Sequence, residues 1–495
     1  MGNLPFGPVI AASLSGSGAS LQFADHQRRD QPAVGSLNAA QYLLIVADRS
    51  VLRAVLRAGH QPSRCVVLAQ QLQLLQRAGA DEKKPPSPAQ PPEEIHRQLQ
   101  NLAPDLAAYG LTGVSRLEAD FAPVLEAMEA RGLPLNVAQW RRVLAEAEAK
   151  AADARTRLGA SVGTDLTGNP SLEPGERGRI LAWFQAEGYP IQSTSKHALA
   201  AVDHPAAQAL LDWREAAKLT STYEGYLDRL AGGRIFGRFH ALGAASGRMS
   251  CGHPNLQNIP ARLRPCVEAP EGRVLVSADY SGCELRIVAA LSRDEALIEA
   301  LLEADFHSAV ARRLFQKPVS KTENPELRHQ AKGINFGLLY GMGAKSLGQD
   351  LGISTTEARA LMDRYFEGFP QLAQWRREAL EVPKQRGFLR TRLGRRLAVD
   401  RSRDIGPLAL NFPVQGGGAD LIKRAAVRVE QALKSANLDG HLVNMIHDEL
   451  LIEASAADGA AVAELVKGEM ITAGAELFKE VPMAVDAAVA SSWSH

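Results

Sequence analysis

The chain has 495 residues, in which 56 Lys and Arg nearly balance 55 Asp and Glu. This length predicts about three or four domains. Its 45% hydrophobic and 22% charged residues exclude a disordered or fibrous protein. No apolar run reaches about 18 residues, so we expect no membrane span and no membrane partner. The four cysteines lack a Cys-x-x-Cys spacing, which argues against a zinc site or a disulfide framework, and without a secretory leader we expect a cytoplasmic protein.

The first half of the chain predicts a small α/β unit followed by helices. Before residue 83, the apolar residues 42–47 indicate a strand and the pattern over 51–56 indicates a helix. The proline-rich residues 83–94 should run extended over the surface, because proline disfavours a helix interior or a central strand. Helical spacing predicts helices near 117–155 and 138–157 and again over 176–230, and residues 164–176 predict a loop.

The second half predicts two strands that each end at a carboxylate. The β-branched run from Gly272 indicates a buried strand that ends at Asp279, and a helical pattern dominates 284–380. The apolar runs 441–446 and 450–453 flank the sequence His447-Asp448-Glu449, which predicts a hairpin with acids at its tip. Distant parts of the sequence would therefore each place a carboxylate at a turn.

Asp279 and Asp448 are candidate ligands of a divalent metal. Carboxylate oxygens on a rigid sheet suit a pair of Mg²⁺ ions, which prefer hard oxygen ligands together with substrate phosphates. Two such ions can clamp the attacking and leaving oxygens of a phosphoryl displacement. The alternative for either residue is a turn aspartate that caps a helix, and taken singly each aspartate favours that alternative.

A third segment places two cations and two aromatic residues on one helix face. Arg328, Lys332, Phe336 and Tyr340 follow one another at steps of four residues. Such a stripe suits a nucleoside triphosphate, with cations for the phosphates and aromatic rings for the sugar and base. The alternative is a solvated basic turn that runs into a buried aromatic turn.

Together these segments resemble the signature motifs of family A DNA polymerases, the bacterial DNA polymerase I group. The three motifs are Asp279-Tyr-Ser-Gly-Cys-Glu-Leu-Arg286, the segment from Arg328 to Gly341, and His447-Asp448-Glu449, and they occur in the family's order. Further matches lie at 246–250, 254–260, 305–307, 394–396 and 411–416. The resemblance covers about 117–495, or roughly three quarters of the chain.

The resemblance implies an α+β multidomain protein with a right-hand polymerase fold. Residues 113–240 would form the thumb, 241–300 together with 405–495 the palm, and 301–404 the fingers. Residues 1–112 would form a small α/β, ribonuclease-H-like remnant of a 3′→5′ exonuclease domain. The 5′-nuclease domain of full-length members is expected to be absent.

The resemblance also assigns roles to the catalytic residues. Asp279 and Asp448, with the Tyr280 carbonyl, would hold two Mg²⁺ ions, for which Mn²⁺ can substitute, and Glu449 would be a supporting acid. Lys332 would also protonate the pyrophosphate leaving group. Glu284 would exclude a 2′-hydroxyl. The residues implied to bind the dNTP are Arg328, Lys332, Phe336, Tyr340, His307 and Glu284, and those implied to bind primer and template are Arg248, Gln257, Asn258, Asn411, Gln415 and His447.

Some positions depart from the family pattern. Gly282 stands where bacterial members usually carry Gln, the segment 394–411 is shorter, and Pro407 replaces an Arg that often contacts DNA; Arg401 and Arg403 are candidate substitutes. Residues 384–403 contain eight Lys or Arg and one acid, which indicates a surface for the DNA backbone, with a solvated loop as the alternative.

The N-terminal residues lack the acids that proofreading requires. No Asp-x-Glu occurs before residue 100, and Asp48 is a single acid after a strand. We therefore expect a non-catalytic exonuclease-like domain. The whole pattern predicts a monomeric DNA-templated DNA polymerase that binds primer-template DNA and dNTPs, and other replication or repair proteins are further candidate partners. The alternatives are an inactive DNA-binding scaffold and a single-subunit RNA polymerase, and Glu284 argues against the latter.

Overall fold

The computed structural model describes residues 9–14, 21–25, 43–58, 62, 64–81, 83, 87–163, 171–339 and 341–493. They divide into two compact units. The first unit comprises 1–131, Phe239–Cys251 and Gly272–Val489, and the second comprises Gly132–Arg238, Gly252–Glu271 and 490–495. Within the described ranges, no helix is both long enough and apolar enough to cross a bilayer. The finer division into thumb, palm and fingers stays a prediction.

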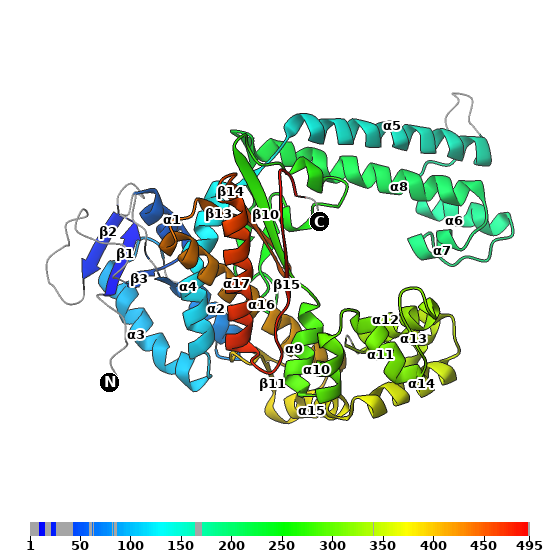
Figure 1. Cartoon of the computed structure of the whole chain (residues 1–495). Coiled ribbons are helices and arrows are strands. Elements are labelled where there is room, and N and C mark those ends of the chain that lie inside the picture. Colours follow the sequence, from blue (N-terminus) through cyan, green and yellow to red (C-terminus); the bar gives the residue numbers. More distant parts are fainter. Residues whose placement is uncertain are drawn as a thin grey trace. The chain divides into compact units, whose positions relative to one another are not determined.

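The N-terminal part of the first unit is the expected small α/β arrangement (Figure 1). Its sheet has the order β2-β1-β3-β4, formed by β1 (Val9–Leu14), β2 (Leu21–Asp25), β3 (Leu43–Val46) and β4 (Arg64–Val67). β1 pairs antiparallel with β2, whereas β1–β3 and β3–β4 are parallel pairs. The helices are α1 (Arg49–Arg57), α2 (Leu68–Arg77) and α3 (Pro92–Ala108).

The start of α3 corrects one prediction. Residues 83–94 were expected to run extended, but the helix already begins at Pro92. Proline is tolerated at the first helical position, where its missing N–H would have had no intrahelical acceptor. Glu93 and Glu94 then place negative charge at the positive end of the helix dipole. The prolines therefore start this helix rather than prevent it.

The core of the first unit is a four-stranded sheet of order β13-β14-β10-β15. Its strands are β10 (Arg273–Tyr280), β13 (Gly440–Ile446), β14 (Glu449–Ser455) and β15 (Val485–Ala490). β10 and β13 both pair antiparallel with β14. The predicted strand and the predicted hairpin are therefore confirmed, and the structure shows that they are neighbours in one sheet. The helices α16 (Gly406–Ser435) and α17 (Gly459–Leu477) pack against each other, and α17 also contacts β10.

A run of helices separates β10 from the hairpin, as the periodicity over 284–380 predicted. They are α9 (Cys283–Ser292), α10 (Glu295–Leu302), α11 (Phe306–Phe315), α12 (Pro325–Leu339), α13 (Ala344–Leu351), α14 (Thr355–Gly368) and α15 (Pro370–Arg386). A two-stranded hairpin of β11 (Phe388–Arg390) and β12 (Arg396–Ala398) follows α15. α15 packs on both α9 and α16, which ties this helical run to the core sheet.

The second unit is built on two long helices that pack side by side (Figure 1). These are α5 (Val137–Val162) and α8 (Pro205–Tyr223), accompanied by α6 (Arg177–Ala186) and α7 (Lys196–Ala200). A small sheet of order β5-β7-β6 joins β5 (Leu133–Pro134), β6 (Leu230–Ala231) and β7 (Arg234–Ile235). β8 (Arg238–His240) and β9 (Ser250–Gly252) form a separate two-stranded sheet, most of whose residues belong to the first unit.

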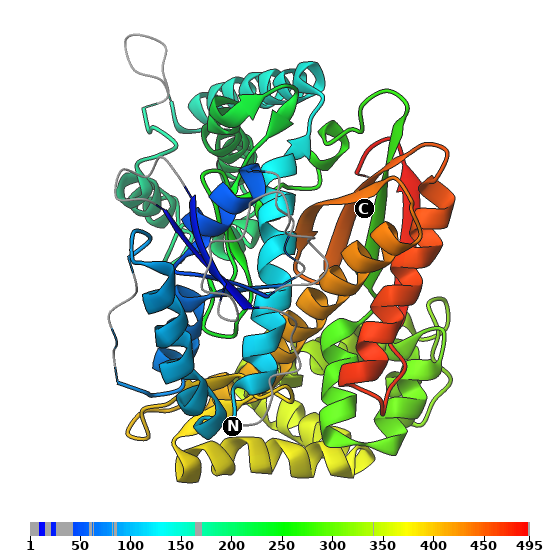
Figure 2. The same cartoon turned by 90° about the vertical axis from the view of Figure 1, so that its left-hand side faces the viewer.

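A buried cluster of charges joins α4 (Thr112–Arg131) to α16, which pack together in the first unit (Figure 2). The Arg395 guanidinium donates to Glu118 and to Asp420 at 2.7 Å, and the Lys423 ammonium donates to the same Glu118 oxygen at 2.6 Å. Arg395 and Lys423 are at most 2% exposed. Because Arg395 is buried among these groups, the prediction that the basic segment 384–403 forms one DNA-facing surface is wrong for this residue.

Removing Glu118 should strongly destabilise the protein. In Glu118→Ala, the buried Arg395 and Lys423 would lose a common carboxylate, and such a loss typically costs about 3–5 kcal/mol. The measurement is urea unfolding at unchanged slope. The matched control is Glu94→Ala, which breaks an exposed pair with Arg97 and should change stability by no more than about 1 kcal/mol. Equal effects in the two variants would contradict the role of the cluster.

Candidate active site

The structure places Asp279 beside the turn that carries Asp448. Asp279 lies near the end of β10, directly opposite Glu449 on β14. The backbone N–H of Tyr280 donates to the Asp448 carbonyl at 3.3 Å. The pairing of β10 with β14 thus brings together the two acids that the sequence analysis selected.

The protein holds these acids in an environment that opposes their ionisation. Burial, followed by the negative charges of Asp448, Glu449 and Asp486, raises the pKa of Asp279 to about 7. Burial also raises the pKa of Asp448. Desolvation and like charge both disfavour a carboxylate, and the nearby Arg248 charge lowers the pKa of Asp448 without outweighing its burial. A bound divalent cation would supply further positive charge.

The donor set has the chemistry of a site that shares its cation with a substrate. Within the described residues, no group of three or more His, Cys, Asp or Glu side chains forms a closed metal cage. Mg²⁺ commonly takes only one or two carboxylates and fills its remaining positions with water and phosphate oxygens. Asp279 and Asp448 match that pattern.

Three further residues hold the turn after β10, and one of them, Asp486, lies outside the quoted motifs. The Ser281 hydroxyl donates to the Asp486 carboxylate on β15, and the Ser281 N–H donates to the Ala484 carbonyl at 3.0 Å. Arg286 donates to the carbonyls of Ser281 at 2.9 Å and Pro482 at 2.7 Å. The sequence analysis missed Asp486, because a single acid in an apolar terminal strand gives no local signal.

His447 and Asp448 form the connection between β13 and β14. His447 is exposed and has a φ of 53°. A positive φ at this position matches the tight hairpin turns that join antiparallel strands. The predicted hairpin with Asp448 at its tip is therefore confirmed.

Glu284 and Arg248 form an ion pair near the two acids. Glu284 lies in the first turn of α9, and one of its oxygens accepts from the Arg248 guanidinium at 2.6 Å. Both charges act on the pKa of Asp448: Glu284 raises it and Arg248 lowers it. The pair therefore fixes the position of the Glu284 carboxylate beside the Asp448 turn.

The helix predicted to carry the cations is present as α12. Arg328 donates two hydrogen bonds to Asp305, at 2.7 and 3.1 Å, and these bonds hold the pKa of the Asp305 carboxyl well below its usual range. His307 lies 3.1 Å from the Asn335 amide nitrogen, and burial lowers the pKa of its imidazole. Lys332 is exposed. The Phe336 side chain and Tyr340 lie outside the described residues.

The candidate primer and template residues are distributed over both units. Asn411 and Gln415 lie one turn apart on α16, and both are half-buried. Gln257 and Asn258 belong to the second unit, in the short helix η3 (Leu256–Asn258). There the Asn258 carbonyl accepts from the Tyr223 hydroxyl at 2.6 Å.

The acidic pair should destabilise the metal-free protein at neutral and higher pH. The folded-state pKa of Asp279 is about 7, above its unfolded value of about 4, so stability falls as the pH rises between these values. Allowing for partial exposure, Asp279→Asn in EDTA should therefore be more stable than the wild type by about 1–2 kcal/mol at about pH 8. Thermal unfolding measures the difference, which should shrink toward zero at about pH 4. A gain that does not depend on pH would contradict this account.

Comparisons with known proteins identify similar chains. The model of the family described as DNA polymerase family A matches residues 184–495. A thermostable DNA polymerase I of Thermus filiformis is 36% identical over 426 residues, which cover 80% of this chain and 50% of that protein. The DNA polymerase I of Chloroflexus aurantiacus is 34% identical over 76% of this chain and 43% of that protein. The chain thus spans about half the length of the curated relatives it matches.

A solved structure is similar along nearly the whole chain. It is the POL domain of Pol1 from M. smegmatis, in complex with a DNA primer-template and dNTP. The match has a TM-score of 0.83 and 28% sequence identity, and it covers 99% of this chain and 95% of that chain.

Proposed function

Because the chain belongs to DNA polymerase family A, we propose that it extends the 3′-hydroxyl of a DNA primer with dNTPs along a template strand. The observation that carries this proposal is the adjacency of Asp279 and Asp448 at one end of the core sheet. The solved relative is described with primer-template DNA and dNTP, which supports the same two partners here.

Asp279 and Asp448, together with the Tyr280 carbonyl, would hold two Mg²⁺ ions or two Mn²⁺ ions. These hard oxygen donors, whose ionisation is opposed by burial, fit such ions. When bound, the ions would stabilise the charge on the attacking and leaving oxygens. Glu449, which is buried opposite Asp279, would raise the negative potential that attracts the cations. Arg286 and Ser281 would keep the turn that carries these donors in place.

The α12 face would bind the triphosphate of the incoming nucleotide. Lys332 is exposed and therefore accessible to a phosphate, and it would give a proton to the leaving pyrophosphate. The two hydrogen bonds to Asp305 fix the Arg328 guanidinium plane, so Arg328 would bind phosphate with little loss of side-chain entropy. His307, positioned by Asn335, would donate to the same group. Phe336 and Tyr340 are proposed to flank the sugar and the new base pair.

Glu284 would select the sugar. Its carboxylate is held by Arg248 at 2.6 Å, so it cannot easily move aside for an additional 2′-hydroxyl. Excluding a larger ligand depends on such rigidity, because a mobile side chain would yield at little cost. The same ion pair would limit how far Arg248 can reach toward the primer.

The remaining candidate residues would position primer and template. His447 at the hairpin tip and Asn411 and Gln415 on α16 present hydrogen-bonding groups that suit the minor-groove edge. The acceptors there are shared by all base pairs, so contacts with them test geometry without reading sequence. Gln257 and Asn258 are proposed to contact DNA from the second unit.

The N-terminal α/β part would have no proofreading activity. Asp48, the acid that follows β3, caps α1 and accepts from the Ser50 N–H at 2.8 Å. This contact matches the helix-capping alternative for an aspartate after a strand. With no Asp-x-Glu before residue 100, we propose a non-catalytic exonuclease-like remnant.

Replacing either aspartate should abolish most of the extension activity. Asp279→Ala and Asp448→Ala should each lower kcat by at least about 10²–10³-fold, the usual effect of losing a group that stabilises transition-state charge. Binding of primer-template should persist, because it depends mainly on cationic side chains. Primer extension in Mg²⁺ and fluorescence anisotropy measure the two quantities. Extension by the wild type separates an enzyme from an inactive scaffold, and near-normal extension by Asp448→Ala would refute the assignment.

Glu284→Ala should relax the choice of sugar. Without the fixed carboxylate, the ratio of kcat/KM for rNTPs to kcat/KM for dNTPs should rise by roughly tenfold or more. Single-nucleotide insertion of rNTP and dNTP on one template gives the ratio, even if total activity falls. A wild-type preference for rNTPs would instead favour an RNA polymerase, and an unchanged ratio in the variant would exclude Glu284 as the selecting residue.

A mismatched primer should remain intact when dNTPs are withheld. Trimming requires a second cluster of acids that activates water, and residues 1–112 do not supply its Asp-x-Glu. The measurement is gel analysis of a labelled, mismatched primer in Mg²⁺. Steady 3′ trimming that is lost in Asp48→Ala would overturn the proposal.

A further inference from the structure

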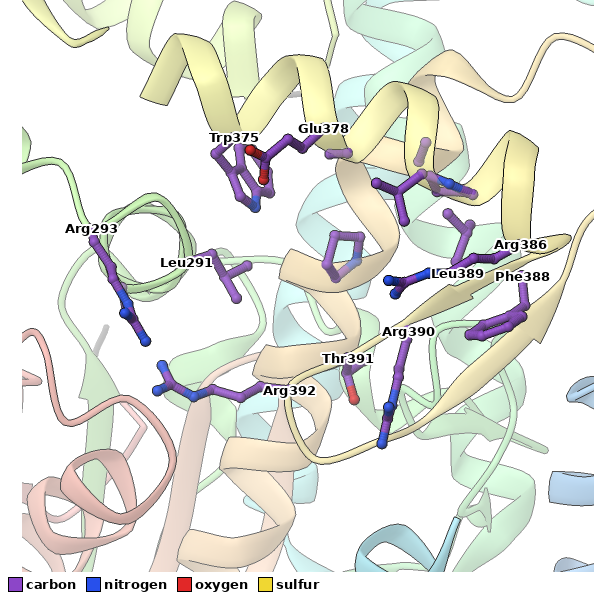
Figure 3. A pocket seen from close by; sticks show the side chains of 16 residues that line it. Leu291, Arg293, Trp375, Glu378, Arg386, Phe388, Leu389, Arg390, Thr391 and Arg392 are labelled. Carbon is purple, nitrogen blue, oxygen red and sulfur yellow. The ribbon is translucent and has the colours of Figure 1, made fainter. Parts of the chain in front are cut away.

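The first unit contains a cavity of about 500 Å³ that is separate from the acidic pair (Figure 3). It lies between α9, α15, the first turns of α16 and the β11 segment that leads into Arg392. Its lining combines an apolar floor, two aromatic residues and four arginines. The residues are Ala290, Leu291, Arg293, Trp375, Glu378, Ala379, Val382, Pro383, Arg386, Phe388, Leu389, Arg390, Thr391, Arg392, Ala409 and Pro413. We call it the arginine-lined cavity.

The four arginines outnumber the acids that neutralise them. Arg392 is held by Glu480 through two bonds of 2.6 Å, and Arg293 lies 3.6 Å from the same carboxylate. Arg293 is 73% exposed, and its side chain points toward that of Arg392 (Figure 3). Arg386 extends from the end of α15 toward the middle of the cavity, and no described acid pairs with it. With Glu378 in the lining and Glu480 shared by two of the four arginines, the cavity keeps an excess of positive charge.

Arg293 occupies a backbone position that normally favours glycine. It is the C-cap of α9 and has a φ of 56°. A residue with a Cβ is disfavoured in this left-handed region, whereas glycine adopts it without that cost. The chain thus keeps a cation at the rim of the cavity despite a conformational cost.

The floor suits a flat, apolar group attached to an anion. Trp375 and Phe388 are half-buried at the cavity wall. The Arg396 guanidinium lies 3.5 Å from the centre of the Phe388 ring, so one face of that ring is already covered. Trp375 remains as the larger aromatic surface. A nucleic-acid base with its phosphate combines these two requirements, because bases stack on aromatic rings and arginine binds phosphate.

The cavity adjoins the candidate DNA site through two shared helices. α9 carries Glu284 in its first turn and Arg293 at its other end, about 14 Å away at the rise of an α-helix. On α16, Ala409 and Pro413 line the cavity, whereas Asn411 and Gln415 alternate with them and face the other side of the helix. A single DNA strand that runs from the reaction site around the start of α16 would reach the cavity.

We propose that the arginine-lined cavity binds a nucleotide unit of single-stranded DNA, with its base on Trp375 and its phosphate on Arg293 and Arg386. The proposal rests on the proposed polymerase function, since template beyond the primer is the single strand that this reaction supplies. A separate single strand of DNA offers the same chemistry as the template overhang, and the experiment distinguishes these two sources. The site holds DNA away from the reacting groups and takes no part in the chemistry.

The test compares two primer-templates that differ only in the length of the template overhang, one nucleotide against about ten. Fluorescence anisotropy of the labelled duplex gives Kd across a range of salt concentrations. The wild type should bind the long overhang about tenfold more tightly, and Arg293→Gly/Arg386→Ala should lose that advantage. The magnitude of the variant's slope of log K against log salt should fall by about 0.7 for the long overhang, the value for one lost phosphate of a single strand.

A control variant separates this site from a general effect of charge. Arg57→Ala/Lys434→Ala removes two exposed cations elsewhere in the first unit and should keep the overhang advantage. Because Arg293→Gly relieves a strained backbone position, the test variant should fold at least as stably as the wild type, which thermal unfolding checks. If both double variants lose the advantage equally, the cavity is not the site.

Trp375 provides a second readout. It is the only tryptophan in the first unit, because Trp140, Trp183, Trp213 and Trp493 belong to the second. The long overhang should quench a fluorescence component that is absent in Trp375→Phe. Quenching by the overhang alone identifies the template strand as the source, and equal quenching by free oligo(dT) identifies a separate strand. Quenching by dTTP or oligo-glutamate but not by DNA would overturn the proposal.

A primer-extension assay of the wild type separates a failure of this proposal from a failure of the proposed function. Extension without any overhang advantage would reject the cavity and leave the polymerase activity intact. An overhang advantage without extension would reject the activity and leave the cavity as a site for single-stranded DNA.

Discussion

The antiparallel pairing of β10 with β14 is the constraint on which the candidate site depends. It sets Asp279 opposite Glu449 and brings the Tyr280 N–H to the Asp448 carbonyl. A strand register is fixed along its whole length, because a shift of one residue would turn every side chain to the other face. The same register therefore sets both the apolar packing of the sheet and the position of the acids. The core of the first unit and its charged edge cannot vary independently.

This pairing has an electrostatic cost that the surrounding residues limit but do not remove. Burial and like charges raise the pKa of Asp279 to about 7, and the nearby Arg248 makes its ion pair with Glu284, whereas Arg395 donates directly to Glu118 and Asp420. The turn is instead held by hydrogen bonds to backbone carbonyls, donated by the Ser281 N–H and the Arg286 guanidinium. The protein thus fixes the geometry of the acids while leaving their charge for a cation to compensate.

Although the net charge is near zero, arginine has three different structural roles in this protein. Arg395 is buried and joins α4 to α16 through carboxylates. Arg328 is half-exposed, and Asp305 sets the orientation of its guanidinium. Arg386 is exposed at the arginine-lined cavity with no acidic partner among the described residues. A guanidinium suits all three situations because it stays charged and binds oxygens in a fixed plane, so the count of charges alone predicts little about function.

The sequence determined the family, the right-hand polymerase fold that the solved relative confirms, and the local elements that carry the motifs: the strand to Asp279, the α12 helix and the Asp448 hairpin. Each has a hydrophobic period or turn signal confined to a few neighbouring residues. Only the tertiary structure decided that Asp486 supports the turn after β10 and that Arg395 is buried. Both depend on contacts between segments far apart in the chain, and a single acid or a basic run has no period that records its partner. Spacing along one element is local information, whereas burial and pairing are properties of the assembled core.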